Sequence, residues 1–234
     1  MATTIRLLAA SYGDSILVSH SSGGSTFNLL IDGGPAKTFG ISSGRRRHGP
    51  LRIALDEIKE KGQDVDLVIL THIDSDHIQG LIRAFKAEGY LGDLAKRVWL
   101  NASSNISNYF NEAEIPENAI PFSTGDSPET SVSEGKTFEQ TLSDLDCWRR
   151  EVIVAEQVLI EGPFKFTILS PTDKNLRKLH CIWPVERFSA DTAGERNDYH
   201  QSITDLLEND TFSKDRSPAN GSSIAFILEI EQKK

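Results

Sequence analysis

Apolar and polar residues alternate in several short stretches of the N-terminal part of the chain. Between some of these stretches, apolar residues recur every three or four positions, as in a helix. The alternation is typical of strands that bury one face. Ser and Gly residues at positions 21–24 predict a hairpin turn, and apolar residues spaced along positions 51–61 predict an amphipathic helix. The strands predicted in this part are residues 4–9, 15–20, 26–31, 66–70 and 97–100. Strands that alternate with helices indicate an α/β fold.

The C-terminal part is more polar, and its pattern is weaker. Residues 111–134 show no sustained period and are predicted to be a loop, and residues 137–145 predict a short helix. Alternating apolar residues predict four further strands, at residues 152–154, 157–160, 164–169 and 224–230. No internal repeat or low-complexity stretch divides the chain, so residues 1–234 are expected to form one domain.

Composition narrows the class of protein. The chain has 38% hydrophobic and 25% charged residues, as in a water-soluble globular protein. Its formal net charge of −9 does not favour broad binding to nucleic acid or anionic membranes, although a local basic patch could still bind nucleic acid. Its apolar runs are too short to span a bilayer, and the N-terminus lacks the apolar core of a signal peptide. Only two cysteines are present, so we do not expect a disulfide scaffold. We expect a cytoplasmic location.

The richest cluster of chemistry follows the predicted strand 66–70, in residues 71–80 (THIDSDHIQG). It holds His72, Asp74, Asp76 and His77, whose imidazole nitrogens and carboxylate oxygens are ligands that suit Zn²⁺, Mn²⁺ or Fe. Asp76 could instead be a helix N-cap, and Thr71 and Asp74 ordinary turn residues. That alternative leaves two of the six histidines in the chain unexplained, so the cluster predicts a site for one or two metal ions.

The pattern His-x-Asp-x-Asp-His after a hydrophobic strand resembles the His-x-His-x-Asp-His signature of the metallo-β-lactamase-fold hydrolases. The resemblance extends to the Gly-Asp-Ser near the N-terminus and to Asp-Gly-Gly at residues 32–34, and it is strongest to the competence-protein-like and phage-defence-associated branches. It implies an αββα sandwich of mixed sheets flanked by helices. It also implies a hydrolase that uses metal-bound hydroxide, with Asp76 orienting the attacking water.

The resemblance gives Asp32 a supporting role beneath the metal loop, although an Asp-Gly turn explains the same residues. Arg45, Arg46 and Arg47 form a basic cluster between glycines, which could bind a phosphodiester or another anionic ester, or could be a solvated loop. The expected partner is therefore a small-molecule or phosphodiester substrate.

Two features depart from the family pattern. Asn101 stands where many members place a further metal-binding histidine, and His180 and His200 are isolated, as is usual for surface or core histidines. The sequence also stops after the strand at 224–230, whereas the family continues to a bridging aspartate and a later histidine. We therefore expect a domain whose second half is incomplete, and either a missing segment or a partner chain to complete it. The alternative function is a catalytically incomplete module that binds or senses within a larger assembly, for example a defence system.

Overall fold

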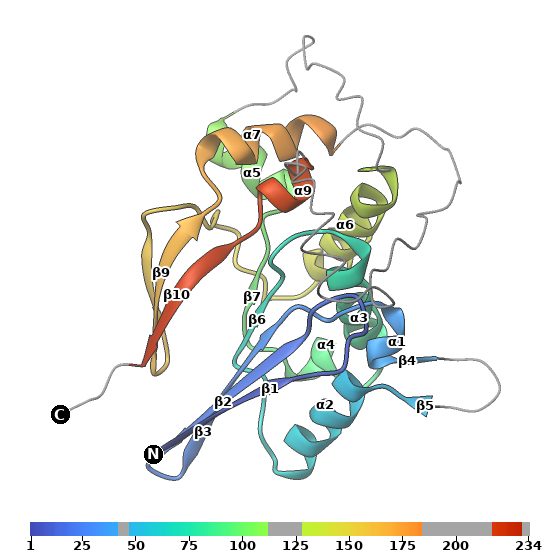
Figure 1. Cartoon of the computed structure of the whole chain (residues 1–234), viewed down its shortest axis with the longest axis vertical. Helices are drawn as coiled ribbons and strands as arrows, with labels where there is room; N and C mark the ends of the chain where they lie inside the picture. The colour runs from blue at the N-terminus through green and yellow to red at the C-terminus, as the bar shows by residue number, and fades with distance from the viewer. Residues whose placement is uncertain (42–46, 112–127, 184–216, 231–234) are drawn as a thin grey trace, which may run out of the picture.

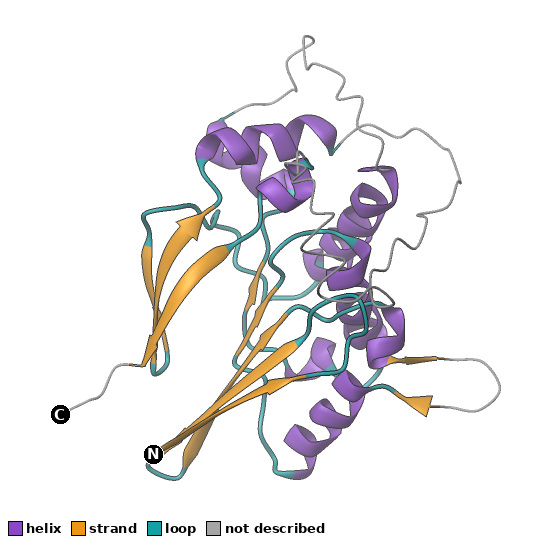
Figure 2. Ribbon diagram, in the orientation of Figure 1, coloured by secondary structure: helices purple, strands orange, loops and turns teal. Residues whose placement is uncertain are grey.

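The computed structural model describes residues 1–41, 47–111, 128–183 and 217–230 (Figure 1). Their two larger β-sheets face each other, with helices packed on the other side of the first sheet (Figures 1 and 2). Among these residues no helix is long and apolar enough to cross a membrane.

The first sheet has five strands in the order β1-β2-β3-β6-β7. The first three are antiparallel to one another, and β3, β6 and β7 run parallel. Gly23 and Gly24 form the turn between β2 and β3 with φ of 60° and 84°, as a two-residue hairpin turn requires. The strands are β1 (Ala2–Leu7), β2 (Ile16–Ser22), β3 (Ser25–Ile31), β6 (Leu67–Ile69) and β7 (Val98–Trp99), which confirms the five strands predicted for this part.

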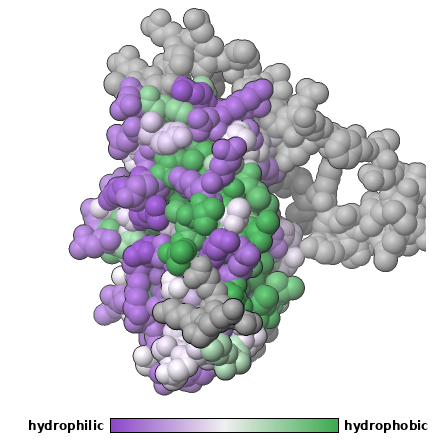
Figure 3. Space-filling view, turned by 90° about the vertical axis from the view of Figure 1, so that its left-hand side faces the viewer, coloured by the Kyte–Doolittle hydropathy of each residue, from purple (hydrophilic) through white to green (hydrophobic). Residues whose placement is uncertain are grey.

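The second sheet is antiparallel, in the order β10-β9-β8. Its strands are β8 (Val158–Glu161), β9 (Phe164–Ser170) and β10 (Ala225–Ile230), close to the predicted ranges. Phe164, Phe166 and Ile168 point inward from β9 and pack with Leu29 and Trp99 of the first sheet, forming the core between the sheets. The opposite face carries exposed apolar side chains, including Ile160 and Ile227, and Figure 3 shows hydrophobic residues on this side of the molecule.

The helices bury a second core against the other face of the first sheet. In α2, Leu51, Leu55 and Ile58 recur at helical spacing and are buried, as predicted. The helices are α1 (Ala36–Phe39), α2 (Pro50–Glu60), α3 (Ser75–Lys86), α4 (Leu91–Leu94), α5 (Ser103–Phe110), α6 (Pro128–Ser143), α7 (Asp173–Ile182) and α9 (Pro218–Gly221). Two short strands, β4 (Gly40–Ile41) and β5 (Arg47–His48), pair with each other beside α1.

Two sequence predictions are wrong. The predicted loop at 111–134 is wrong for residues 128–134, which begin α6, and residues 112–127 lie outside the described part of the chain. The helix predicted at 137–145 is the second half of α6, where Phe138 packs on Phe85 of α3 with ring centroids 5.3 Å apart. Residues 152–154 are not a strand, because the backbone N–H and C=O of Ile153 bond to the side chain of Asn101 instead of to a neighbouring strand.

Candidate metal centre

The loop with the predicted ligands lies where strand β6 ends and helix α3 begins. Strands β3 and β6 are parallel neighbours, so their carboxyl ends meet at one edge of the sheet. Asp32 follows β3 and Thr71 follows β6, and the backbone N–H of Asp32 donates to the carbonyl of Ile69 at 2.8 Å. The parallel pairing therefore brings together two motifs that are 39 residues apart in the sequence.

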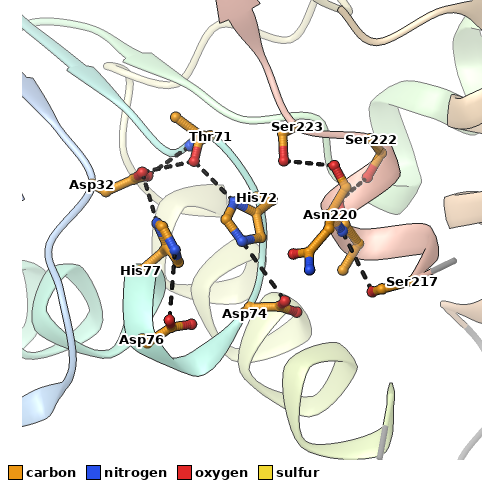
Figure 4. A network of polar contacts seen from close by, with 11 residues as sticks. Asp32, Thr71, His72, Asp74, Asp76, His77, Ser217, Asn220, Ser222 and Ser223 are labelled. Carbon is orange, nitrogen blue, oxygen red and sulfur yellow. Dashed lines mark hydrogen bonds and ion pairs between the residues drawn. The ribbon is translucent and has the colours of Figure 1, made fainter. Parts of the chain in front are cut away.

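Asp32 is the anchor of this loop, as Figure 4 shows. Its Oδ1 accepts from the backbone N–H of Thr71 at 2.7 Å, and its Oδ2 accepts from the Thr71 hydroxyl at 2.6 Å. The same Oδ2 lies 2.9 Å from Nδ1 of His77. The side chain is buried and its backbone takes a left-handed φ of 56°, which aspartate tolerates better than most residues. Asp32 is thus held in place and holds the loop in turn.

These bonds fix which nitrogen of each histidine carries the proton. An ionised carboxylate only accepts, so His77 donates from Nδ1 to Asp32. The hydroxyl of Thr71 donates its hydrogen bond to Asp32, so the hydroxyl oxygen of Thr71 accepts from Nδ1 of His72, 3.0 Å away. Each neutral ring therefore has an unprotonated Nε2, the form of imidazole that binds a metal.

The two rings lie side by side, with centroids 4.0 Å apart. Nε2 of His72 is 3.7 Å from Oδ2 of Asp74, and Nε2 of His77 is 3.7 Å from Oδ2 of Asp76 (Figure 4). Two ligands each about 2.0–2.2 Å from one Zn²⁺ lie no more than about 4.4 Å apart, so one ion fits between the members of each pair.

The protonation behaviour of the two rings differs. Burial lowers the pKa of His72, and the nearby His77 lowers it further. The charges of Asp74, Asp32 and Asp76 raise this pKa, but the net effect is a pKa below the ordinary value of histidine. Burial also lowers the pKa of His77, but the hydrogen bond and charge of Asp32, with the charges of Asp76 and Asp14, outweigh burial and raise it above its ordinary value.

Close backbone packing holds helix α3 against the loops around Asp32. The N–H of Gly33 donates to the carbonyl of His77, and the N–H of Gly80 to the carbonyl of Gly34, both at 2.8 Å. A Cβ on Gly80 would lie 1.9 Å from the carbonyl oxygen of Gly33, and one on Gly13 would lie 1.8 Å from that of Asp76. Only glycine permits these two approaches.

Asn101 is not placed as a metal ligand. Its Nδ2 donates to the carbonyl of Ile153 at 2.7 Å, and its Oδ1 accepts from the N–H of the same residue at 2.9 Å. The amide is buried, and both of its ends are used to hold residues 152–154. Asn101, compared above with a metal-binding histidine of the family, therefore has a structural role.

The remaining predicted residues are elsewhere or outside the described part of the chain. His180 is buried on α7, near the Ser103 hydroxyl. Arg45, Arg46 and His200 lie outside the described residues, and only the backbone of Arg47 is described, in β5. The predicted anion-binding role of the arginines stays a prediction.

No pattern in the sequence predicted that α9 lies at this site. The N–H of Ile224 donates to the carbonyl of Thr71 at 2.9 Å, which ties the segment after α9 to the metal loop. Figure 4 shows Asn220 of α9 on the His72 and Asp74 side of the loop. A contact between residues more than a hundred positions apart leaves no local signal in a sequence.

The predicted ligands form two pairs that each suit a metal ion, but neither pair is a complete set of ligands. In the described part of the chain, no three His, Cys, Asp or Glu side chains lie together so that they could hold one ion. A catalytic Zn²⁺ usually takes three protein ligands and one water. The described residues therefore supply two ligands for each of two positions.

The sequence profile of the metallo-beta-lactamase superfamily matches residues 9–144, more than half of the chain. The chain belongs to this superfamily, which confirms the predicted fold class. A search of curated proteins found no match.

Solved structures of the same fold resemble the chain weakly. The hydrolase AbOPH of the beta lactamase superfamily shares 18% identity over 68% of this chain and 52% of its own, with a TM-score of 0.36. MEM-A1, a subclass B3 metallo-beta-lactamase from a soil metagenome library, shares 18% over 67% and 49%, with a TM-score of 0.32. Zn²⁺-bound PqqB from Methylobacterium extorquens shares 18% over 67% and 38%, with a TM-score of 0.30. The chain spans about half the length of the first two structures.

Proposed function

We propose that the chain is a metal-dependent hydrolase domain whose centre is the loop of residues 71–77. The observation that carries this proposal is the arrangement of the two histidines: each has its Nδ1 occupied by a hydrogen bond and its Nε2 beside a carboxylate. A structural histidine needs only a satisfied hydrogen bond. Two unprotonated nitrogens facing carboxylates in a shared site are what a divalent cation requires.

His72 and Asp74 would hold one ion, and Asp76 and His77 the second, with Zn²⁺ the first candidate and Mn²⁺ or Fe the alternatives. An ion bound there would lower the pKa of a water molecule and polarise the bond to be cut. Asp76 would accept a hydrogen bond from the attacking water and orient it. Asp32 would keep the His77 ring fixed and its Nε2 unprotonated.

For the substrate we propose a phosphodiester or another anionic ester. The support is the basic cluster Arg45, Arg46 and Arg47, which the sequence places between the Asp32 loop and the metal loop. Arginine binds phosphate oxygens through two parallel hydrogen bonds. We also propose a cytoplasmic location, which the small number of cysteines supports, because two are too few for a disulfide scaffold.

A second candidate function is a module of the same fold that binds or senses without catalysis, within a larger assembly such as a defence system. The observation in its favour is that the described residues bring no three ligands together, and that Asn101 is committed to the backbone of Ile153. Such a module would hold a metal weakly or not at all.

Metal content and turnover separate the two functions. The purified chain would be stripped with a chelator, reloaded with Zn²⁺ or Mn²⁺, and its metal content measured by mass spectrometry. Turnover would then be measured on bis(p-nitrophenyl) phosphate and on p-nitrophenyl acetate. The proposal expects about one or two ions per chain and metal-dependent hydrolysis that favours the phosphodiester.

The His77→Ala variant is the control, because contaminating hydrolases do not depend on this residue. Bound metal without turnover, or no bound metal, would favour the binding module. Hydrolysis that persists in His77→Ala would contradict the proposed site.

A further inference from the structure

Gln79 of helix α3 connects three segments around the metal loop. Its Oε1 accepts from the backbone N–H of Ala36 at 3.2 Å, and its Nε2 donates to Oε1 of Glu134 on α6 at 2.6 Å. Ala36 begins the helix that follows the Asp32 loop, and Gln79 stands one turn after Asp76. One side chain therefore joins the Asp32 loop, the first turns of α3 and α6.

This connection adds to the two backbone bonds between the same segments, Gly33 to His77 and Gly80 to Gly34. The backbone bonds fix the distance between the loop and the helix. Gln79 is held at both ends of its amide, so it resists rotation of α3 about its own axis. Such a rotation would move Asp76 and His77, which lie in the first turn, relative to Asp32.

Glu134 brings a carboxylate to this place, although accepting a hydrogen bond from Gln79 requires only a neutral oxygen. Its Oε2 is buried and has no hydrogen-bond partner in the described part of the chain. Burial raises the pKa of Glu134, the polar groups of Ser75 and Gln79 lower it, and the charges of Asp74 and Asp76 raise it again, with a net rise. A glutamine could hold Gln79 equally well without adding a third acidic group to this cluster. Oε1 of Glu134 is paired with Gln79, but the buried Oε2 is not paired among the described residues, and a buried carboxylate oxygen without a partner near other acidic groups is costly unless a cation lies nearby.

We propose that Gln79 and Glu134 are positioning residues of the metal loop, and that the charge of Glu134 also favours a divalent cation there. This inference rests on the proposed metal-binding function. It gives α6, a helix without any of the predicted ligands, a part in the site.

The test separates the two contributions of Glu134. Glu134→Gln keeps an oxygen to accept from Gln79 but removes the charge, whereas Glu134→Ala removes both, and Gln79→Ala removes the connection and leaves the charge. Zn²⁺ affinity would be measured by calorimetry, and the visible spectrum of the Co²⁺-loaded protein would report the ligand geometry. Gln140→Ala, an exposed substitution on the same helix, is the matched control.

We expect Gln79→Ala and Glu134→Ala to weaken Zn²⁺ binding about 10- to 100-fold, as the loss of a group that orients ligands does. Both should change the Co²⁺ spectrum, whereas Glu134→Gln should weaken binding by a smaller factor and keep the spectrum of the wild type. Gln140→Ala should change neither. Circular dichroism would verify that each variant is folded.

The outcomes are distinguishable. A wild-type chain that binds no Zn²⁺ overturns the proposed function, and this inference with it. A wild-type chain that binds Zn²⁺, with affinities and spectra unchanged in Gln79→Ala and Glu134→Ala, overturns this inference alone. A Glu134→Gln variant as weak as Glu134→Ala, with an altered spectrum, would contradict the division into position and charge.

Discussion

The two halves of the metal loop use the same residue types but are held differently. In the His77 half, the ring donates to the buried carboxylate of Asp32, which receives three hydrogen bonds and ties the loop to the neighbouring strand. In the His72 half, Nδ1 of the ring bonds to the hydroxyl of Thr71, its neighbour in sequence, and not to a carboxylate. The pKa of His77 is raised and that of His72 is lowered, although burial acts on both rings.

The difference shows that one carboxylate organises both halves, one directly and one through a relay. Asp32 sets the tautomer of His77 by accepting a hydrogen bond from its Nδ1–H, and it sets the tautomer of His72 by accepting the hydrogen bond of the Thr71 hydroxyl. A change at Asp32 should therefore disturb both histidines, and a change at Thr71 should disturb mainly His72.

The largest effect is expected from Asp32. In Asp32→Asn, the amide oxygen remains the acceptor for the fixed backbone N–H of Thr71. The amide nitrogen therefore takes the place of Oδ2 and faces the ring of His77. His77 would then accept at Nδ1 and carry its proton on Nε2, the nitrogen needed for the metal. We expect Zn²⁺ affinity to fall about 10- to 100-fold, by calorimetry, with the tautomer change visible in nitrogen NMR spectra of the metal-free protein.

Asp32→Ala separates the tautomer from stability. It leaves the two donors of Thr71 and the one of His77 without their acceptor, each at a cost of about 1–3 kcal/mol if no water replaces it. Urea unfolding should therefore show a larger loss of stability in Asp32→Ala than in Asp32→Asn, while both bind metal poorly. Wild-type metal affinity in Asp32→Asn would reduce Asp32 to a turn residue.

A smaller effect is expected from Thr71→Val, which removes the hydroxyl and keeps the shape of the side chain. Asp32 retains the backbone N–H and His77, but Nδ1 of His72 loses its acceptor, so the tautomer of this ring is no longer fixed. We expect Zn²⁺ affinity to fall about 3- to 10-fold, corresponding to one hydrogen bond of about 1 kcal/mol. NMR should show His77 unchanged and His72 as a mixture of tautomers.

Thr71→Ser is the matched control, because it keeps the hydroxyl and removes only a methyl group. It should bind metal like the wild type. An equal loss in the Ser and Val variants would mean that packing, and not the relay of hydrogen bonds, orients His72.

The sequence predicted the parts of this site that lie in one stretch. His72, Asp74, Asp76 and His77 fall within six positions after a recognisable buried strand, and the Asp-Gly-Gly of residues 32–34 pointed to Asp32. The contact between Gln79 and Glu134 spans 55 residues, and the use of Asn101 to hold Ile153 spans 52. Neither has a local pattern, because tertiary packing alone brings the partners together. The same reason explains the first part of α6: residues 128–136 show no period, and the sequence predicted a helix only from residue 137.

The smallest effect concerns pH in the metal-free protein, where the two halves should act in opposite directions. The folded pKa of His77 is raised, so its contribution to stability is fully present below the unfolded pKa and is lost as the pH rises through the folded value. The folded pKa of His72 is lowered, so the folded state resists protonation and stability falls as the pH drops below the unfolded pKa.

The free energy of unfolding, measured with urea at pH values on both sides of the ordinary pKa of histidine, should therefore have a shallow maximum near that pKa. Difference curves against two variants isolate each half from other titrating groups. Asp32→Asn should remove the decline on the alkaline side, because His77 loses the carboxylate that raises its pKa. His72→Gln should remove the part of the acid-side decline that belongs to His72. If NMR titration of the wild type placed the pKa of His72 above that of His77, the two environments would be alike or reversed, and the contrast between the halves of the loop would not hold.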